Sequence, residues 1–243
     1  VWVATITNTF FRNYNPYKDK IHGDWFDDQG RVHHTGEVYL NGKSLWEVES
    51  LEKVLNPVEV KDNFDAAYLD RVEQRVNWYT SRDMYVMLDM HQDLYSIFLG
   101  GDGAPEWACR TNGATPISLP GGSPWWLKNI DATVVNSWIN FWQYTNHKDL
   151  QDHYILAWQK IAERFKNNPY VIGYDLMNEP WGGDLIKVFL TGEFERSQLS
   201  ALYSRLIPAL RKTDPNKYIF FEPTPAPVTF GAPSNLPKIS DTR

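Results

Sequence analysis

Three stretches of the chain pair an amphipathic helical pattern with a short apolar run. The first predicts a helix over residues 65–83, followed by a strand over residues 85–91 that ends in ionisable side chains. The apolar positions of this helix, spaced three or four residues apart, are Leu69, Val72, Val76 and Tyr79. Each unit is therefore expected to bury one helix face against the strand that follows it.

The same pattern occurs twice more towards the C-terminus. Residues 150–165 predict a helix and residues 170–177 a strand. The third helix is expected over residues 199–210, and its strand over residues 218–222. Pro223 ends that strand because proline cannot donate to a sheet ladder.

Alternating helices and strands predict a parallel sheet with right-handed crossovers. In such folds ligands bind beyond the carboxyl ends of the strands, which is where the polar residues of these runs lie. An open nucleotide-binding sheet is typified by a glycine-rich phosphate loop, and neither common form of that loop occurs here. The pattern therefore favours a (β/α)8 TIM barrel, or part of one.

Two regions fall outside the repeated pattern. Residues 94–149 form a long connection that is rich in tryptophan, and we expect it to cap the site. Within it, a short amphipathic helix is predicted around residues 134–142. Residues 1–64 are expected to form an N-terminal part of the barrel. Within them, residues 27–30 predict a turn and residues 38–43 a hairpin edge.

Composition narrows the function classes. The 24 basic and 30 acidic residues give a formal net charge of -6, and no stretch is rich in Lys or Arg, so nucleic acid is not expected as a partner. Cys109 is a single cysteine and supports neither a disulfide within the chain nor a zinc site. Aromatic residues reach 15%, an excess that sugar-stacking side chains would explain.

The first predicted strand presents three ionisable groups on one face. Side chains alternate across a strand, so Asp89, His91 and Asp93 are expected on one side, and Leu88 and Met90 on the other. For Asp89 we favour a hydrogen-bonded network inside the barrel. His91 and Asp93 lie nearer the mouth, where they are expected to contact the substrate.

The triplet Asn178-Glu179-Pro180 follows the second strand directly. A carboxyl group at a strand mouth, walled by Trp181, would be partly desolvated and its pKa raised, as a general acid at neutral pH requires. Asn178 would offer a neutral donor to a sugar hydroxyl. The alternative is a helix-capping asparagine followed by a first-turn glutamate, and the position after a strand weighs against it.

Glu222 ends the third strand in a similar way. Retaining glycosidases need a second carboxyl group about 5 Å from the acid, so Glu222 is a candidate for the nucleophile. The strands that carry Glu179 and Glu222 would be neighbours, which disfavours that role and favours a substrate-lining or structural carboxylate.

Several tryptophans in the predicted loops are candidates for stacking on sugar rings. They are Trp107, Trp125, Trp126 and Trp181. The histidines lack the spacing of metal ligands, and no metal site is expected.

Several separate motifs resemble glycoside hydrolase family 5, in its endoglycoceramidase branch. They are Tyr68–Val72, Leu88–Asp93, Gly103–Ala108 and Tyr174–Pro180, and they occur in the family's order. The resemblance extends over residues 68–243. The fold that it implies is a (β/α)8 barrel, and the activity is hydrolysis, with retention, of the β-glucosidic bond between an oligosaccharide and ceramide.

The resemblance also implies roles for particular residues. Glu179 would be the acid/base, which protonates the ceramide oxygen and later deprotonates the attacking water. Asn178 would hold the sugar 2-hydroxyl, and His91 and Asp93 would bind the glycone sugar. Trp107, Trp181 and Glu222 are further expected to contact the substrate. No cofactor is implied, because two carboxyl groups supply the chemistry.

The chain departs from the family pattern in two places. The family's nucleophilic glutamate lies on the seventh strand, whereas this sequence reaches about the fifth, and the second barrel strand has no recognisable counterpart in residues 43–60. We therefore expect residues 65–243 to be barrel units with the insertion at 94–149 and with the C-terminal strands missing. The chain alone would be inactive, with a complementing C-terminal half as partner.

Two other functions stay open from the sequence. One is cellulase-like hydrolysis of β-glucans within the same family, and the other is a catalytically dead glycan-binding protein. The expected substrates are a glycosphingolipid or an oligosaccharide, with transient contact to a membrane surface and a secreted or extracellular location.

Overall fold

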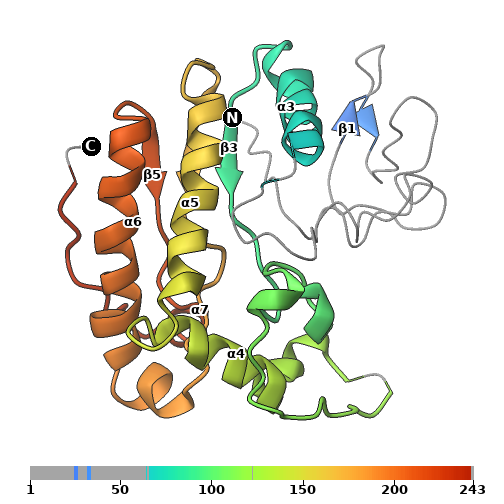
Figure 1. Ribbon diagram of the computed structural model, residues 1–243, viewed down its shortest axis with the longest axis vertical. Helices are drawn as coiled ribbons and strands as arrows, with labels where there is room; N and C mark the ends of the chain where they lie inside the picture. Colours follow the sequence, from blue (N-terminus) through green and yellow to red (C-terminus); the bar gives the residue numbers. More distant parts are fainter. Residues whose placement is uncertain (1–24, 27–31, 34–63, 65, 122, 242–243) are drawn as a thin grey trace.

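Three parallel strands form the sheet of the computed structural model, which describes residues 25–26, 32–33, 64, 66–121 and 123–241 (Figure 1). Their order is β3 (Val86–Asp89), β4 (Val171–Asp175) and β5 (Tyr218–Phe220). Both pairings are parallel, and Asp89 lies in register with Asp175. The predicted alternation of helix and strand is confirmed, and so is the parallel sheet.

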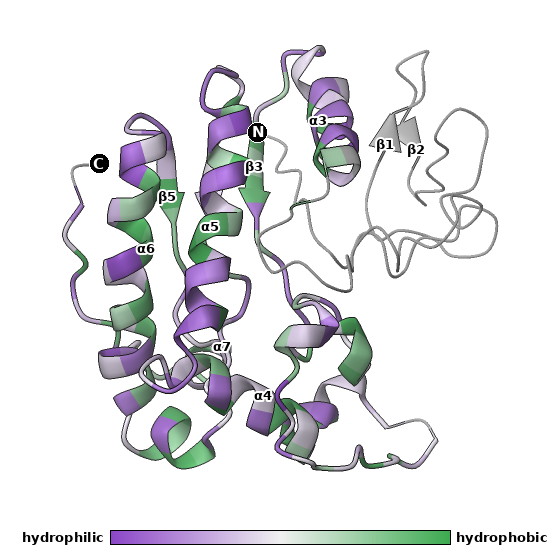
Figure 2. Cartoon of the chain, viewed as in Figure 1, coloured by the Kyte–Doolittle hydropathy of each residue, from purple (hydrophilic) through white to green (hydrophobic). Residues whose placement is uncertain are grey.

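The helices that connect and cover the strands follow the predicted periodicity. In the described part of the chain, the longer α-helices are α3 (Ala66–Thr80), α4 (Ala132–Trp142), α5 (Lys148–Phe165) and α6 (Ser200–Thr213). Short helical turns complete the chain order: η1 (Ile97–Leu99), η2 (Glu106–Ala108), η3 (Trp125–Ile130), the π-helical η4 (Ile186–Leu190) and η5 (Phe194–Leu199), and α7 (Pro225–Thr229). Figure 2 shows polar and apolar faces alternating along α5 and α6.

The core lies between the sheet and the helices α5 and α6. The side chains of Trp158, Leu202 and Leu206 are fully buried there. The Trp158 indole N–H donates to the carbonyl of Leu176 at 3.0 Å, just beyond the end of β4. Burial of these large side chains supplies the main favourable free energy, and the indole bond fixes the height at which β4 ends.

The long connection between β3 and α5 is folded rather than extended. The Tyr95 hydroxyl donates to the carbonyl of Ala108 at 2.9 Å, and the Asn140 side chain donates to the carbonyl of Arg110 at 2.6 Å. Asp131 caps α4 by accepting from the Thr133 N–H at 2.8 Å. The predicted amphipathic helix of this region is confirmed as α4, which buries Trp138 and its neighbours.

Only a small part of the N-terminal region is described. Strands β1 (Trp25–Phe26) and β2 (Val32–His33) pair in antiparallel fashion, consistent with the turn predicted between them. The hairpin edge predicted at 38–43 and the region 43–60 lie outside the described residues. The assignment of residues 1–64 to the barrel therefore stays a prediction, as does the number of barrel strands.

Among the described residues, no helix combines the length and the apolar character that a membrane span needs.

A buried hydrogen bond on the outer face of β4 provides a test of this packing. The Tyr174 hydroxyl donates to Asp214 at 2.7 Å, and both residues are about 1% exposed. We expect Tyr174→Phe to lower the free energy of unfolding by about 1–3 kcal/mol, because it leaves a buried carboxylate without that donor.

Tyr144→Phe is the matched control, since the Tyr144 hydroxyl donates to Asp152, whose side chain is 40% exposed. It should change stability by less than about 0.5 kcal/mol. Urea denaturation followed by tryptophan fluorescence measures both values, and equal effects of the two variants would contradict the packing described.

Candidate active site

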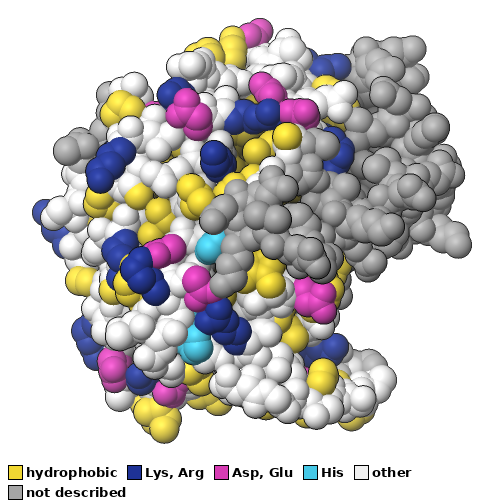
Figure 3. All heavy atoms as spheres, viewed as in Figure 1, with side chains coloured by type: hydrophobic (Ala, Val, Ile, Leu, Met, Phe, Trp, Pro, Cys, Tyr) yellow, Lys and Arg dark blue, Asp and Glu magenta, His cyan; other side chains and the backbone are white. Residues whose placement is uncertain are grey.

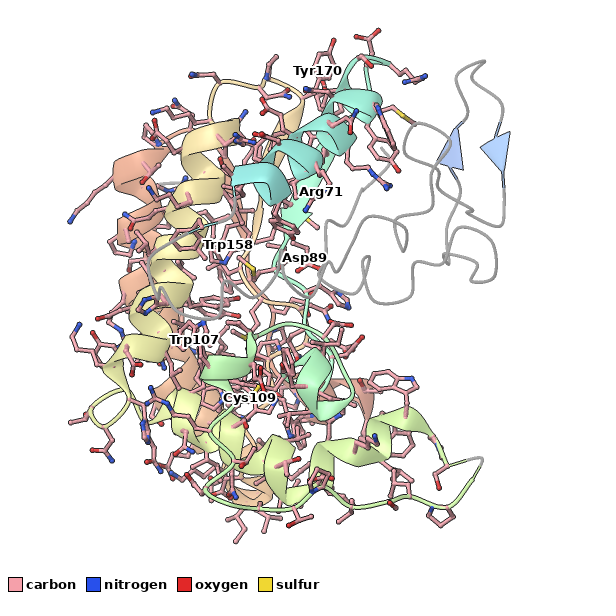
Figure 4. All side chains as sticks on the ribbon, turned by 45° about the vertical axis from the view of Figure 1, so that its right-hand side comes forward. Arg71, Asp89, Trp107, Cys109, Trp158 and Tyr170 are labelled. Carbon is pink, nitrogen blue, oxygen red and sulfur yellow. The ribbon has the colours of Figure 1, made fainter. Side chains whose placement is uncertain are left out.

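Acidic residues meet at the carboxyl end of the sheet. Asp89 and Asp175 are the last residues of β3 and β4, and each is 7% exposed. Their in-register pairing places both carboxyl groups on the same face of the sheet. Figure 4 labels Asp89 at this end of β3. Sequence analysis placed Asp89 in a network and did not single out Asp175.

His91 lies between the carboxyl groups of Asp89 and Asp93, at the carboxyl end of β3. Its Nδ1 lies 3.0 Å from Asp89 Oδ2, and its Nε2 lies 3.6 Å from Asp93 Oδ2. The predicted grouping of these three residues on one side of the chain is confirmed. The imidazole therefore lies between two acceptors, an arrangement that favours its charged form.

This environment sets the charge of His91. Burial alone would lower its pKa, but the hydrogen bonds and negative charges of Asp89 and Asp93 outweigh burial and raise the pKa to about 10. The ring is thus an imidazolium at neutral pH. Burial also raises the pKa of Asp89, and the bond to His91 works against that rise.

The glycine-rich loop at residues 100–103 pairs with the backbone of Asp93. The backbones of Asp93 and Asp102 exchange hydrogen bonds of 3.2 and 2.7 Å. A Cβ on Gly101 would lie 1.6 Å from the Asp93 carbonyl oxygen, so only glycine permits this approach. The sequence predicted residues 94–149 as one long connection, but not that its residues 100–103 hold Asp93.

Asn178 and Glu179 lie beside this cluster, as predicted. The Asn178 side-chain nitrogen is 3.4 Å from His91 Nε2 and donates to the carbonyl of Gln92 at 3.2 Å. Glu179 is exposed, and its backbone φ is +44°. Burial and the charge of Asp93 raise the pKa of Glu179, whereas the charge of His91 lowers it.

Glu222 reaches Glu179 from the next strand end. Its Oε2 accepts a hydrogen bond from the Glu179 backbone N–H at 2.9 Å. Burial raises the pKa of Asp175 to about 7, helped by the negative charges of Asp89 and Glu222. Burial likewise raises the pKa of Glu222. The repulsion between these acids favours the neutral form of Asp175.

The predicted tryptophans are found in three kinds of surroundings. Trp107 lies beside α5, where its ring packs edge-on to His153 with 5.1 Å between centroids (Figure 4). Trp181 is 9% exposed and packs against Phe189, so it presents little surface beside Glu179. Trp125 and Trp126 are exposed at 56% and 55%. Sugar contact by any of them stays a prediction.

Three side chains beside the glycine-rich loop have a spacing that would suit the ligands of a small cation. Ligand atoms of His91, Asp93 and Asp102 lie within 4.8 Å of one another. An imidazolium with raised pKa is a poor ligand, because a metal binds the neutral ring. The expected absence of a metal stays a prediction.

Comparison with known proteins identifies related chains. Residues 53–226 match the model of the cellulase family, glycosyl hydrolase family 5, and residues 1–104 match that of a glycoside hydrolase 120 insertion domain. Endoglycoceramidase I of Rhodococcus hoagii is 35% identical over 181 residues, which cover 72% of this chain and 35% of that protein. Endoglucanase H of Acetivibrio thermocellus is 30% identical over 95 residues, 39% of this chain and 9% of that protein.

Solved structures agree with the sequence matches. Endo-glycoceramidase II from Rhodococcus sp. is 40% identical and superimposes with a TM-score of 0.70, covering 79% of this chain and 43% of that one. Structures of that enzyme include a lactosyl-enzyme intermediate and a ganglioside GM3 complex.

This chain thus spans less than half the length of these relatives. Endoglycoceramidases are prominent among the relatives, and their barrel fold accounts for the parallel sheet. The family model covers most of the chain, including the strand ends that carry His91 and Glu179. The chain belongs to glycosyl hydrolase family 5.

Proposed function

We propose that this chain forms part of a retaining β-glycosidase that cleaves the oligosaccharide–ceramide bond of glycosphingolipids. One observation carries the proposal: Glu179 lies beside His91, Asp93 and Asn178 at the ends of neighbouring parallel strands. The similarity to endoglycoceramidases, one of them solved with a ganglioside, favours this substrate class over β-glucans.

In this proposal Glu179 is the acid/base. Its raised pKa increases the protonated fraction near neutral pH, so that the carboxyl can give its proton to the ceramide oxygen as the glycosidic bond breaks. The resulting carboxylate then takes a proton from the water that releases the sugar. Its exposed position leaves room for a leaving group to approach.

The neighbouring groups would bind the glycone sugar. The His91 imidazolium presents its Nε2–H as a donor, 3.6 Å from Asp93, while the Asp93 carboxylate presents acceptors and the Asn178 amide presents both. Such alternating donors and acceptors match the hydroxyl groups of a sugar ring. The negative charges near His91 also suit the positive charge that develops on the sugar in the transition state.

The nucleophile is proposed to come from a later barrel strand, as in the family. On β5, Tyr218 and Phe220 project from the same face of the sheet as Asp175 and are 58% and 37% exposed, an unusual state for large side chains on a strand. A further parallel strand would cover them. We call the assembly of this chain with the strands that carry the nucleophile the completed barrel, and propose that activity requires it.

Transient contact with a lipid surface is proposed through an apolar rim, defined as Leu185, Ile186, Phe189, Leu190 and Phe230. Each of these side chains is at least 46% exposed. They lie on η4 and at the end of α7, and hydrophobic side chains are visible at the lower edge of Figure 3, below the sheet. Phe189 packs on Trp181, two residues beyond Glu179, so the rim is near the site. The secreted location expected from the sequence stays a proposal.

The acid/base role can be tested with leaving groups of different acidity. In the completed barrel, Glu179→Gln should lower kcat/KM for lactosylceramide by about 10²–10⁴-fold, because an alkoxide leaves poorly without a proton. A dinitrophenyl lactoside needs no protonation and should lose less than about tenfold. Equal losses on both substrates would contradict the role.

The same assay separates the proposed function from its alternatives. Cleavage of cello-oligosaccharides in preference to lactosylceramide would indicate a β-glucanase. Calorimetric binding of lactose with no turnover by the completed barrel would indicate a glycan-binding protein.

The charges around Glu179 predict opposite changes in the pH profile. Asp93→Asn removes a negative charge that raises the Glu179 pKa, so the alkaline limb of kcat/KM should move to lower pH. His91→Gln removes a positive charge that lowers this pKa, so the limb should move to higher pH. Asp152→Asn, on the surface of α5, should leave the limb in place, and shifts of the same sign in the first two variants would refute the assignment.

Contact with lipid can be measured by sedimentation with neutral phosphatidylcholine vesicles that contain lactosylceramide. The double variant Ile186→Ser, Leu190→Ser should bind at least fivefold less, because both side chains lose apolar area that the bilayer would cover. Tyr218→Ser is the control, since that exposed ring lies at the opposite end of the sheet. Equal binding by the wild type, the double variant and Tyr218→Ser would rule out lipid contact through the rim.

A further inference from the structure

The backbone of Glu179 has a conformation that needs support. Its φ of +44° lies in the left-handed region, which favours glycine, and Pro180 follows directly. A residue with a Cβ persists there only when its neighbours hold it in place. The direction of the Glu179 side chain depends on this backbone angle, since the Cα–Cβ bond turns with it.

Two side chains hold the peptide groups on either side of that residue. The Glu222 carboxylate accepts from the Glu179 N–H at 2.9 Å. On the opposite side, the Gln92 side chain donates to the carbonyls of Glu179 and Asn178 at 3.0 and 3.1 Å. Glu222 follows β5 and Gln92 follows β3, so the two strands flanking β4 clamp the segment between them.

Glu222 is itself well anchored. The hydroxyl of Tyr203, a fully buried residue of α6, donates to the Glu222 carbonyl at 3.0 Å. The Glu222 carboxyl group also lies near Asp175, the buried last residue of β4, whose pKa its negative charge helps to raise. These contacts aim one carboxylate oxygen at a backbone N–H of the neighbouring segment, rather than leaving it to face a sugar.

We propose that Glu222 is the positioning residue of Glu179: its carboxylate fixes the left-handed backbone that directs the acid/base carboxyl group at the leaving oxygen. Gln92 completes the clamp from the other strand. This inference rests on the proposed function of Glu179, and it gives Glu222 a role other than nucleophile or sugar ligand. A charged acceptor suits it because an N–H bond to a carboxylate is stronger than one to a neutral oxygen.

Kinetics on the completed barrel test the positioning role. Glu222→Leu removes the acceptor and should lower kcat/KM for lactosylceramide at least 30-fold, since a shift of about 1 Å in a catalytic group can cost about 10²-fold. The loss for dinitrophenyl lactoside, which needs no acid, should stay below threefold. Glu222→Gln keeps an acceptor oxygen and should recover most of the lactosylceramide rate, to within about fivefold of the wild type.

Two results would overturn the inference. Equal losses on both substrates in Glu222→Leu would indicate general damage to the site, and inactivity of Glu222→Gln on both would indicate a nucleophile. Glu179→Gln is run alongside. If Glu179→Gln loses the same factor on lactosylceramide and on dinitrophenyl lactoside, the proposed function fails. If Glu179→Gln loses more on lactosylceramide but Glu222→Leu loses the same factor on both substrates, only the positioning role fails.

A second measurement uses this chain alone and needs no turnover. Amide hydrogen exchange, read by NMR, should show the Glu179 N–H exchanging at least tenfold faster in Glu222→Leu than in the wild type, with most of the protection kept in Glu222→Gln. Glu163→Gln, a substitution on the exposed face of α5, controls for remote effects. Unchanged protection in Glu222→Leu would overturn the inference.

Discussion

The candidate site depends on the interaction of the charged His91 ring with the carboxylates of Asp89 and Asp93. Parallel pairing brings Asp89 and Asp175 side by side, and Asp93, Glu179 and Glu222 lie nearby. Like charges so close together would repel strongly in a partly buried place. The imidazolium offsets part of that repulsion, and burial together with the remaining repulsion raises the pKa values of Asp89, Asp175, Glu179 and Glu222.

The charge of each ionisable group in the site therefore depends on its burial and on its charged neighbours. His91 takes a full positive charge because two carboxylates bond to it, whereas Asp175 approaches neutrality because it is buried beside other acids. Glu179 lies between these extremes: it is exposed enough to meet a substrate, and partial burial and the charge of Asp93 raise its pKa. An acid that must give and later regain a proton needs such an intermediate environment.

Rigid backbone supports these charges from three directions. The approach of the loop at Gly101 fixes Asp93, the Trp158 indole fixes the end of β4, and Glu222 with Gln92 fixes the segment that carries Glu179. Each contact joins residues that are not neighbours in the sequence. The side chains that need exact positions for catalysis are thus positioned by the sheet and its helices, and not by the loops alone.

Sequence by itself determined the elements and the candidate groups. The spacing of apolar residues predicted α3, α5 and α6 and the three strands, because helical and extended periods are local properties of the chain. Alternation along the first strand grouped Asp89, His91 and Asp93, and the position of Asn178 and Glu179 after a strand marked the site. The motifs indicated the family that the comparisons confirm.

Only the tertiary structure decided how these groups meet. Pairing register between β3 and β4, segments more than 80 residues apart, brought Asp175 into the cluster, and the sequence did not indicate it. Packing against Phe189 covers most of the Trp181 ring, which the sequence did not indicate either. Glu222 was predicted to be a substrate-lining or structural carboxylate, and only the structure shows that its carboxylate accepts from the backbone N–H of Glu179. Periodicity fixes which face a side chain takes, whereas its partner across the sheet depends on register and on the helices packed behind, which no local pattern encodes.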